Sequence, residues 1–138
     1  MRLEEILDMS IALLCVFLSF ILIYLAKLPL TYAMYKLDNR YDNHYPREQQ
    51  SRLSGFGKRA LAAHLNGFES FPAYGIGVLF AIYSGVNEEI LNIFCISFVS
   101  LRLFYLLFYW TDKPLFRSIV WSLSFFVIIG IYILALIS

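Results

Sequence analysis

The long uncharged segment near the start of the chain constrains the fold most strongly. From Met9 to Ala26 there is no charged side chain, and a helix of this length is enough for one membrane crossing at about 1.5 Å per residue. Together with its flanks and three later apolar stretches, it predicts helical spans at about 9–32, 60–84, 87–110 and 115–137. The expected fold is therefore all-α, a single integral membrane four-helix bundle over residues 1–138.

Composition supports this prediction. Hydrophobic residues make up 60% of the 138 residues and charged residues only 15%, which is too apolar for a soluble domain of this size. Acidic residues precede the first apolar run and no small-residue cleavage site follows it, so we expect that run to be retained rather than removed as a signal peptide. The net charge of +1 gives no reason to expect a nucleic-acid partner.

Positive charges are concentrated in two of the three connections between spans. The first connection holds or adjoins six of them: Lys36, Arg40, Arg47, Arg52, Lys58 and Arg59. Lys113 lies between the third and fourth spans and Arg117 at the head of the fourth, whereas residues 85–89 contain no lysine or arginine. By the positive-inside rule, loops 33–59 and 111–114 should be cytoplasmic, with both termini on the opposite side and anionic lipid headgroups near the cations. The short, compact chain suggests a bacterial inner membrane.

The second span carries polar side chains at a depth where they are costly and therefore point to function. Arg59, Asn66 and Glu69 fall within about 80° of each other on a helix, whereas His64 lies about 140° from Arg59. The first three form one polar stripe. His64 is better interpreted as a structural histidine with a hydrogen-bond partner on another helix.

The third span has a second polar stripe, because Arg102, Tyr105 and Tyr109 share a helix face of about 60°. A carboxylate and an arginine in separate apolar spans are best accommodated as partners, so we expect Glu69 and Arg102 to approach each other. A structural ion pair that fixes helix register is one interpretation. The additional donors favour another, a site for a polar and anionic ligand.

Cysteine and metal chemistry are not expected. Cys15 and Cys95 fall inside predicted spans without redox or metal-ligand spacing, so we interpret them as small buried residues. Asp42 and His44 lack a third candidate ligand and are assigned to a solvated loop of about 20 residues. Pro29 should kink the first helix near its end.

The glycines and tryptophans of the spans carry weaker expectations. Gly75 and Gly77 should permit close helix packing. Trp110 and Trp121 are expected to be lipid contacts or interface anchors.

These motifs resemble the family of membrane-associated proteins in eicosanoid and glutathione metabolism (MAPEG), and its bacterial members in particular. The resemblance is strongest in Pro46-Arg47-Glu48, Arg59-Ala60 and the second-span pattern Ala-His-x-Asn-x-x-Glu-x-x-Pro. It is carried by Arg59, Ala63, Asn66, Glu69 and Pro72, followed by Arg102, Tyr105 and Tyr109.

The resemblance implies a homotrimer that holds glutathione between neighbouring subunits and receives a lipophilic substrate from the bilayer. Asn66 and Glu69 would bind the peptide, while Arg102, Tyr105 and Tyr109 would hold its carboxylates and backbone. Arg59 is the nearest cation to a motif arginine that this chain replaces with Ala62. Arg117, one residue out of register, is the candidate that would contact the sulfur and favour its thiolate.

Two functions from different classes are therefore expected. One is a glutathione-dependent transferase or peroxidase acting on lipophilic electrophiles or lipid hydroperoxides. The other is a noncatalytic membrane protein that binds a lipid or a partner protein through the same site. A channel or transporter is less well supported, since the spans show no internal repeat and no broken helix pair.

Overall fold

The computed structural model describes the backbone of residues 3–138 and the side chains of residues 11–138. This part of the chain is helical throughout, apart from short connections, and contains no strand. The helices are α1 (Leu3–Leu25), α2 (Lys27–Asp38), α3 (Pro46–Ser51), α4 (Gly55–Tyr83), α5 (Glu88–Trp110) and α6 (Pro114–Ile137).

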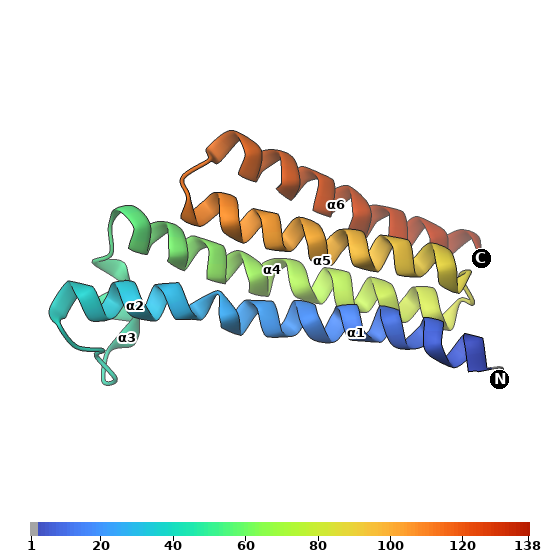
Figure 1. Ribbon diagram of the computed structural model, residues 1–138, viewed down its shortest axis with the longest axis horizontal. Helices are drawn as coiled ribbons and strands as arrows, with labels where there is room; N and C mark the ends of the chain where they lie inside the picture. Colours follow the sequence, from blue (N-terminus) through green and yellow to red (C-terminus); the bar gives the residue numbers. More distant parts are fainter. Residues whose placement is uncertain (1–2) are drawn as a thin grey trace.

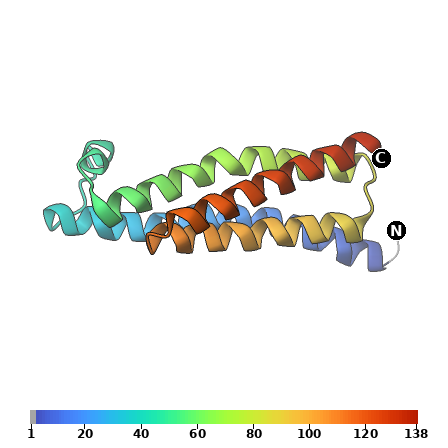
Figure 2. The same cartoon turned by 90° about the horizontal axis from the view of Figure 1, so that it is seen from above.

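The long helices lie side by side (Figure 1). Helices α1 and α2 follow each other along nearly one line, and α4 packs against α1, α2, α5 and α6. The start of α1, the α4–α5 turn and the C-terminus lie at one end of the bundle, as Figure 2 also shows. The connection that contains α3 and the α5–α6 turn lie at the other end, so the two cation-rich connections are on the same side of the molecule.

Among the described residues, three helical segments are long and apolar enough to cross a membrane: Ile11–Asp38, Glu88–Trp110 and Pro114–Ile137. Large apolar side chains also cover the outside of the bundle, for example Phe17 (57% exposed) and Phe126 (66%), as expected of a surface in contact with lipid. Helix α4 has 29 residues and is also long enough to cross a membrane. Its polar side chains lower its mean hydropathy, so it is not one of these three segments.

The first helical segment extends further than the sequence predicted. Instead of ending at about residue 32, the chain breaks its helix at Ala26 and continues as α2 to Asp38. Pro29 explains the break, because it has no N–H for the carbonyl of Leu25. The predicted loop 33–59 therefore contains the end of α2, all of α3 and the start of α4, and Leu30 and Met34 of α2 are buried.

Gln49 fixes the connection between α2 and α4. Its side chain is fully buried, and its Nε2 lies within hydrogen-bonding distance of the Met34 carbonyl (3.0 Å), the Arg40 carbonyl (2.9 Å) and Asp38 Oδ2 (2.9 Å). Its Oε1 accepts from the backbone N–H of Asp42 at 3.0 Å. One amide thus holds three parts of the connection together.

Two carboxylates stabilise the same connection. Asp38 forms an ion pair with Arg52, in which Nη1 donates to Oδ1 at 3.0 Å. Asp42 Oδ1 accepts from the backbone N–H of Tyr45 (3.0 Å) and His44 (2.9 Å), and these two bonds hold the pKa of Asp42 below its ordinary value. Asp42 therefore closes a turn of the backbone.

Only one of the two glycines expected to allow close packing has that role. A Cβ at Gly77 would lie 2.8 Å from Cε2 of Tyr132 on α6, whereas a Cβ at Gly75 would meet only Cζ of Phe71, at 4.0 Å. Tyr132 also donates its hydroxyl to the carbonyl of Ala73 at 3.1 Å. Gly77 is thus the position at which α4 and α6 approach closely.

The core contains both cysteines. Cys15 and Cys95 are buried, as predicted, and both are free. They belong to the same apolar cluster as Tyr74 and Phe98, whose rings stack with centroids 3.9 Å apart.

Candidate functional site

A chain of hydrogen bonds joins α4 to α5 in the middle of the bundle. Arg102 Nη2 donates to Asn66 Oδ1 at 2.9 Å, and Asn66 Nδ2 donates to Glu69 Oε2 at 2.8 Å. The sequence predicted that Glu69 and Arg102 approach each other, and both line one cavity, although the ion pairs among the described residues do not include these two. Asn66 lies between them and bridges the two charges.

Arg102 is a deeply buried cation. Its side chain is 5% exposed, and its guanidinium lies 4.2 Å from the ring centroid of Tyr105, close enough for a cation–π interaction. Nη1 is buried and has no hydrogen-bond partner among the described residues. The guanidinium therefore has a free donor inside the bundle.

Two tyrosines connect Arg102 with the first turn of α6. The rings of Tyr105 and Tyr109 meet edge to face with centroids 5.3 Å apart, and the guanidinium of Arg117 lies 4.6 Å from the centroid of Tyr109. Residues Arg102, Tyr105, Tyr109 and Arg117 thus form one continuous row. We call this row and the Asn66–Glu69 pair the polar cluster.

Arg59 has a different partner. Its Nη1 lies 3.3 Å from Oδ2 of Asp112, a residue of the α5–α6 turn with a left-handed φ of 57°. The ion pair links the start of α4 to that turn, and no hydrogen bond in the described residues joins Arg59 to Asn66. Of the predicted site residues, Arg59 is the one that the structure leaves outside the polar cluster.

His64 is structural, as predicted. Its Nδ1 lies 2.8 Å from the carbonyl oxygen of Ile23 on α1, and its ring packs edge to face on Phe68. The imidazole therefore supplies a hydrogen bond to a carbonyl in the last turn of α1, just before the break at Ala26.

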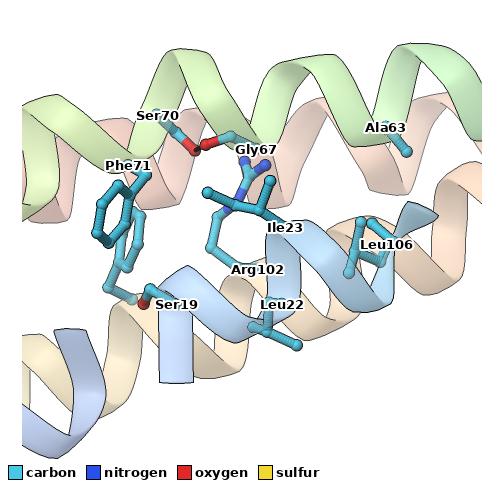
Figure 3. Close-up of a pocket in the computed structure, with 11 residues that line it drawn as sticks. Ser19, Leu22, Ile23, Ala63, Gly67, Ser70, Phe71, Arg102 and Leu106 are labelled. Carbon is cyan, nitrogen blue, oxygen red and sulfur yellow. Dashed lines mark hydrogen bonds between the residues drawn. The ribbon is translucent and has the colours of Figure 1, made fainter. Parts of the chain in front are cut away.

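Two cavities adjoin Arg102. The larger, of about 200 Å³, lies between α4, α5 and α6, with Asn66, Glu69 and Arg102 on one side and Trp121 and Phe125 on the other. The smaller, of about 20 Å³, lies between α1, α4 and α5 (Figure 3). Sequence reasoning missed Trp121 and Phe125 as cavity residues, because an i, i+4 aromatic pair on an apolar helix is indistinguishable from a lipid contact.

The protein has three helical segments able to cross a membrane, and polar side chains are buried between its helices. These features place it in the class of integral membrane proteins. A model of the MAPEG family matches residues 11–137, nearly the whole chain, so the protein belongs to the MAPEG family. Searches of the curated proteins and of the solved structures returned no match. The family includes glutathione transferases and peroxidases as well as noncatalytic members.

Proposed function

We propose that this protein is a membrane-bound glutathione-dependent transferase or peroxidase that acts on lipophilic electrophiles or lipid hydroperoxides. The observation that carries the proposal is the buried Arg102, which Asn66 links to Glu69 beside a cavity of about 200 Å³. A buried cation with a free donor is well suited to an anionic group.

Glutathione matches the charges of this cavity. It is a tripeptide with two carboxylates, an amino group and two amide bonds. Arg102 would hold a carboxylate, Tyr105 and Tyr109 would donate to the backbone, and the exposed carboxylate of Glu69 would accept from the amino group. Because Arg59 is engaged by Asp112 and residue 62 is alanine, Arg102 becomes the principal cation for the ligand.

Arg117 would serve the reacting sulfur. A free thiol has a pKa of about 8.5, and a guanidinium fixed nearby in a medium of low dielectric constant favours the thiolate. In the transferase reaction, the sulfur forms a bond to an electrophilic carbon while the leaving group departs with its electron pair. In the peroxidase reaction, two glutathione thiols are oxidised to a disulfide and the hydroperoxide is reduced to an alcohol and water.

The same proposal includes the assembly and its setting. The 29 residues of α4 would span more than 40 Å, so α4 would be a fourth crossing helix whose polar stripe faces a neighbouring subunit. Three copies would form a homotrimer in a bacterial inner membrane, with both cation-rich connections in the cytoplasm. Lipophilic substrates and membrane lipids would reach the cavity past Trp121 and Phe125, which are 44% and 47% exposed.

The test of ligand binding is the thermal stability of the detergent-purified protein across a glutathione titration, with S-hexyl glutathione in parallel. A ligand that binds only the folded state raises the melting temperature with concentration. We expect a saturable shift that is lost in Glu69→Gln and Arg102→Ala. Glu88→Gln, at the start of α5, removes a charge away from the cluster and should keep the shift.

Catalysis has its own test. Arg117→Ala should retain the glutathione shift but lose turnover by about 10²-fold or more, since one electrostatic donor is missing in the transition state. Normal turnover in this variant would assign Arg117 to the alternative role of a positive-inside anchor at the start of α6.

The second candidate function is noncatalytic binding of a lipid or a partner protein. It is favoured by the aromatic side of the cavity, where Trp121 and Phe125 stack with nearly parallel rings and face outward. An intact oligomer without a glutathione shift, and without thiol-dependent turnover of any electrophile, would support this candidate.

A further inference from the structure

We propose that the groove between α2 and the start of α4 binds one anionic glycerophospholipid, with the phosphate of its headgroup beside Lys36. None of the residues that line this groove lines the cavity beside Arg102, and neither of the functions proposed above requires it. The inference therefore concerns a second binding site on the same chain.

The groove is formed where α2 packs against α4. It has a volume of about 330 Å³, within the range of roughly 300–1,000 Å³ that is typical of small-molecule sites. The two helices come close at Gly57, where a Cβ would lie only 3.1 Å from Cβ of Ala33. The larger apolar side chains of the lining include Tyr32, Leu37 and Phe56, which are all exposed. The groove is thus open to its surroundings and has apolar sides.

Lys36 gives the groove its charge. Among the described residues that line it, Lys36 alone is charged; its side chain is exposed, and its Nζ lies 5.6 Å from the ring centroid of Tyr32. The ion pairs of the described residues do not include Lys36. The nearest acidic residue in the sequence, Asp38, is already bound by Arg52 and Gln49. The ammonium group of Lys36 is therefore accessible to an anion.

The groove lies at the level of the lipid headgroups. The crossing segment Ile11–Asp38 has 28 residues, or about 42 Å of helix, whereas the hydrocarbon core of a bilayer is about 30 Å thick. Its last turns follow the first cation, Lys27, and extend beyond the hydrocarbon at the end of the bundle where α2 meets the start of α4 (Figure 1). Tyr32, followed one turn later by Lys36, is typical of a membrane–water interface. A lipid of the adjoining leaflet can thus enter the groove from the side.

The two kinds of lining fit the two parts of a phospholipid. A lysine ammonium group binds phosphate, and the exposed carbons of Tyr32, Leu37 and Phe56 can cover the glycerol and the first methylenes of an acyl chain. A free inorganic anion would leave that apolar surface in water. A zwitterionic headgroup carries an ammonium group of its own, which Lys36 repels, so a headgroup with a net negative charge fits better.

The experiment is native mass spectrometry of the full-length protein in detergent, titrated with dioleoyl phosphatidylglycerol, dioleoyl phosphatidylcholine or inorganic phosphate. We expect saturable binding of one phosphatidylglycerol per subunit. Lys36→Gln should weaken this binding about fivefold, because one lysine beside an anionic headgroup is lost, and Phe56→Ala should weaken it as well. Lys113→Gln is the matched control, since it removes an exposed lysine from the α5–α6 turn, at the same end of the bundle but outside the groove. Its affinity should stay nearly unchanged.

Several results would overturn the inference. Without saturable binding of phosphatidylglycerol there is no such site, and equal losses in Lys36→Gln and Lys113→Gln would mean that the lipid is attracted to the whole cation-rich end. Equal affinity for phosphatidylcholine would show that charge is not selected, and equal affinity for inorganic phosphate would assign Lys36 to a free anion. Dissociation of the oligomer in Lys36→Gln or Phe56→Ala would mean that a second copy of the chain covers the groove. Because Lys36 is exposed, Lys36→Gln should fold and decides the outcome even if Phe56→Ala does not.

Discussion

Asn66 has a role that few side chains could fill. Its carboxamide accepts from Arg102 through oxygen and donates to Glu69 through nitrogen, so a neutral group links a cation to an anion. An aspartate at this position would repel Glu69, and an aliphatic residue would leave both partners unpaired. Asn66 and Glu69 on α4 and Arg102 on α5 thus form one hydrogen-bonded unit of three residues.

Asn66→Ala should destabilise the protein. The substitution leaves Nη2 of the buried Arg102 without its acceptor, a loss of about 1–3 kcal/mol. Thermal unfolding in detergent measures it, with Asn43→Ala in the exposed α2–α3 connection as the control, where a change within about 0.5 kcal/mol is expected. Equal stability of the two variants would contradict the bridging role of Asn66.

The two glycines of α4 provide a matched pair at the scale of helix packing. Gly77→Ala should force Tyr132 to shift and lose its hydrogen bond to Ala73, at a cost of about 1–3 kcal/mol from overpacking. Gly75→Ala meets no close neighbour and gains helix propensity of up to about 1 kcal/mol. Melting temperatures should therefore move in opposite directions. A larger loss at Gly75 would mean that this face of α4 packs against something outside the single chain.

The connection between α2 and α4 depends on Gln49. Gln49→Ala would remove an amide that joins α2 to the turn after it, and we expect a loss of about 1–3 kcal/mol with faster hydrogen exchange over residues 39–54. In the described residues, the side chain of the neighbouring Gln50 makes one weak hydrogen bond, from Nε2 to the sulfur of Met34 at 3.8 Å, so Gln50→Ala should leave exchange nearly unchanged. Similar protection in both variants would show that the connection is held by other contacts.

Helices formed by long apolar runs could be predicted from the sequence, whereas a helix in a polar segment could not. Helices α5 and α6 begin and end within one residue of the predicted spans, because the polar residues 87–89 mark the start of α5 and the polar residues 111–113 mark its end and the start of α6. Helix α3 was missed, since Gln49 lies in a polar, turn-prone sequence and nothing in that sequence marks it as buried.

The candidate site could also be predicted only in part from the sequence. Helical spacing correctly placed Arg102, Tyr105 and Tyr109 on one face. Spacing within one helix carries no information on how two helices are rotated against each other, so neither the bridge through Asn66 nor the pairing of Arg59 with Asp112 could be foreseen.

Within the whole molecule, charge and topology agree. The cation-rich connections lie at one end of the bundle, and the α4–α5 turn lies at the other, together with the C-terminus (Figure 1). If α4 crosses the membrane with the three apolar helical segments, the residues at these two ends must face different compartments. This relation can be tested without any ligand.

Single cysteines at the two ends should react on opposite sides of the membrane. Asn43→Cys and Thr111→Cys are at exposed positions of the cation-rich end, and Glu89→Cys is exposed near the α4–α5 turn. A membrane-impermeant maleimide should label Glu89→Cys in intact cells, and the other two only after the membrane is opened, because the cation-rich end is cytoplasmic.

The wild type is the control for this labelling, since its two cysteines are buried and should stay unreactive. Labelling of all three variants from outside would contradict the orientation. Labelling of Asn43→Cys and Thr111→Cys from different sides would contradict the crossing of α4, because α4 and α5 together return the chain to the side on which α4 began.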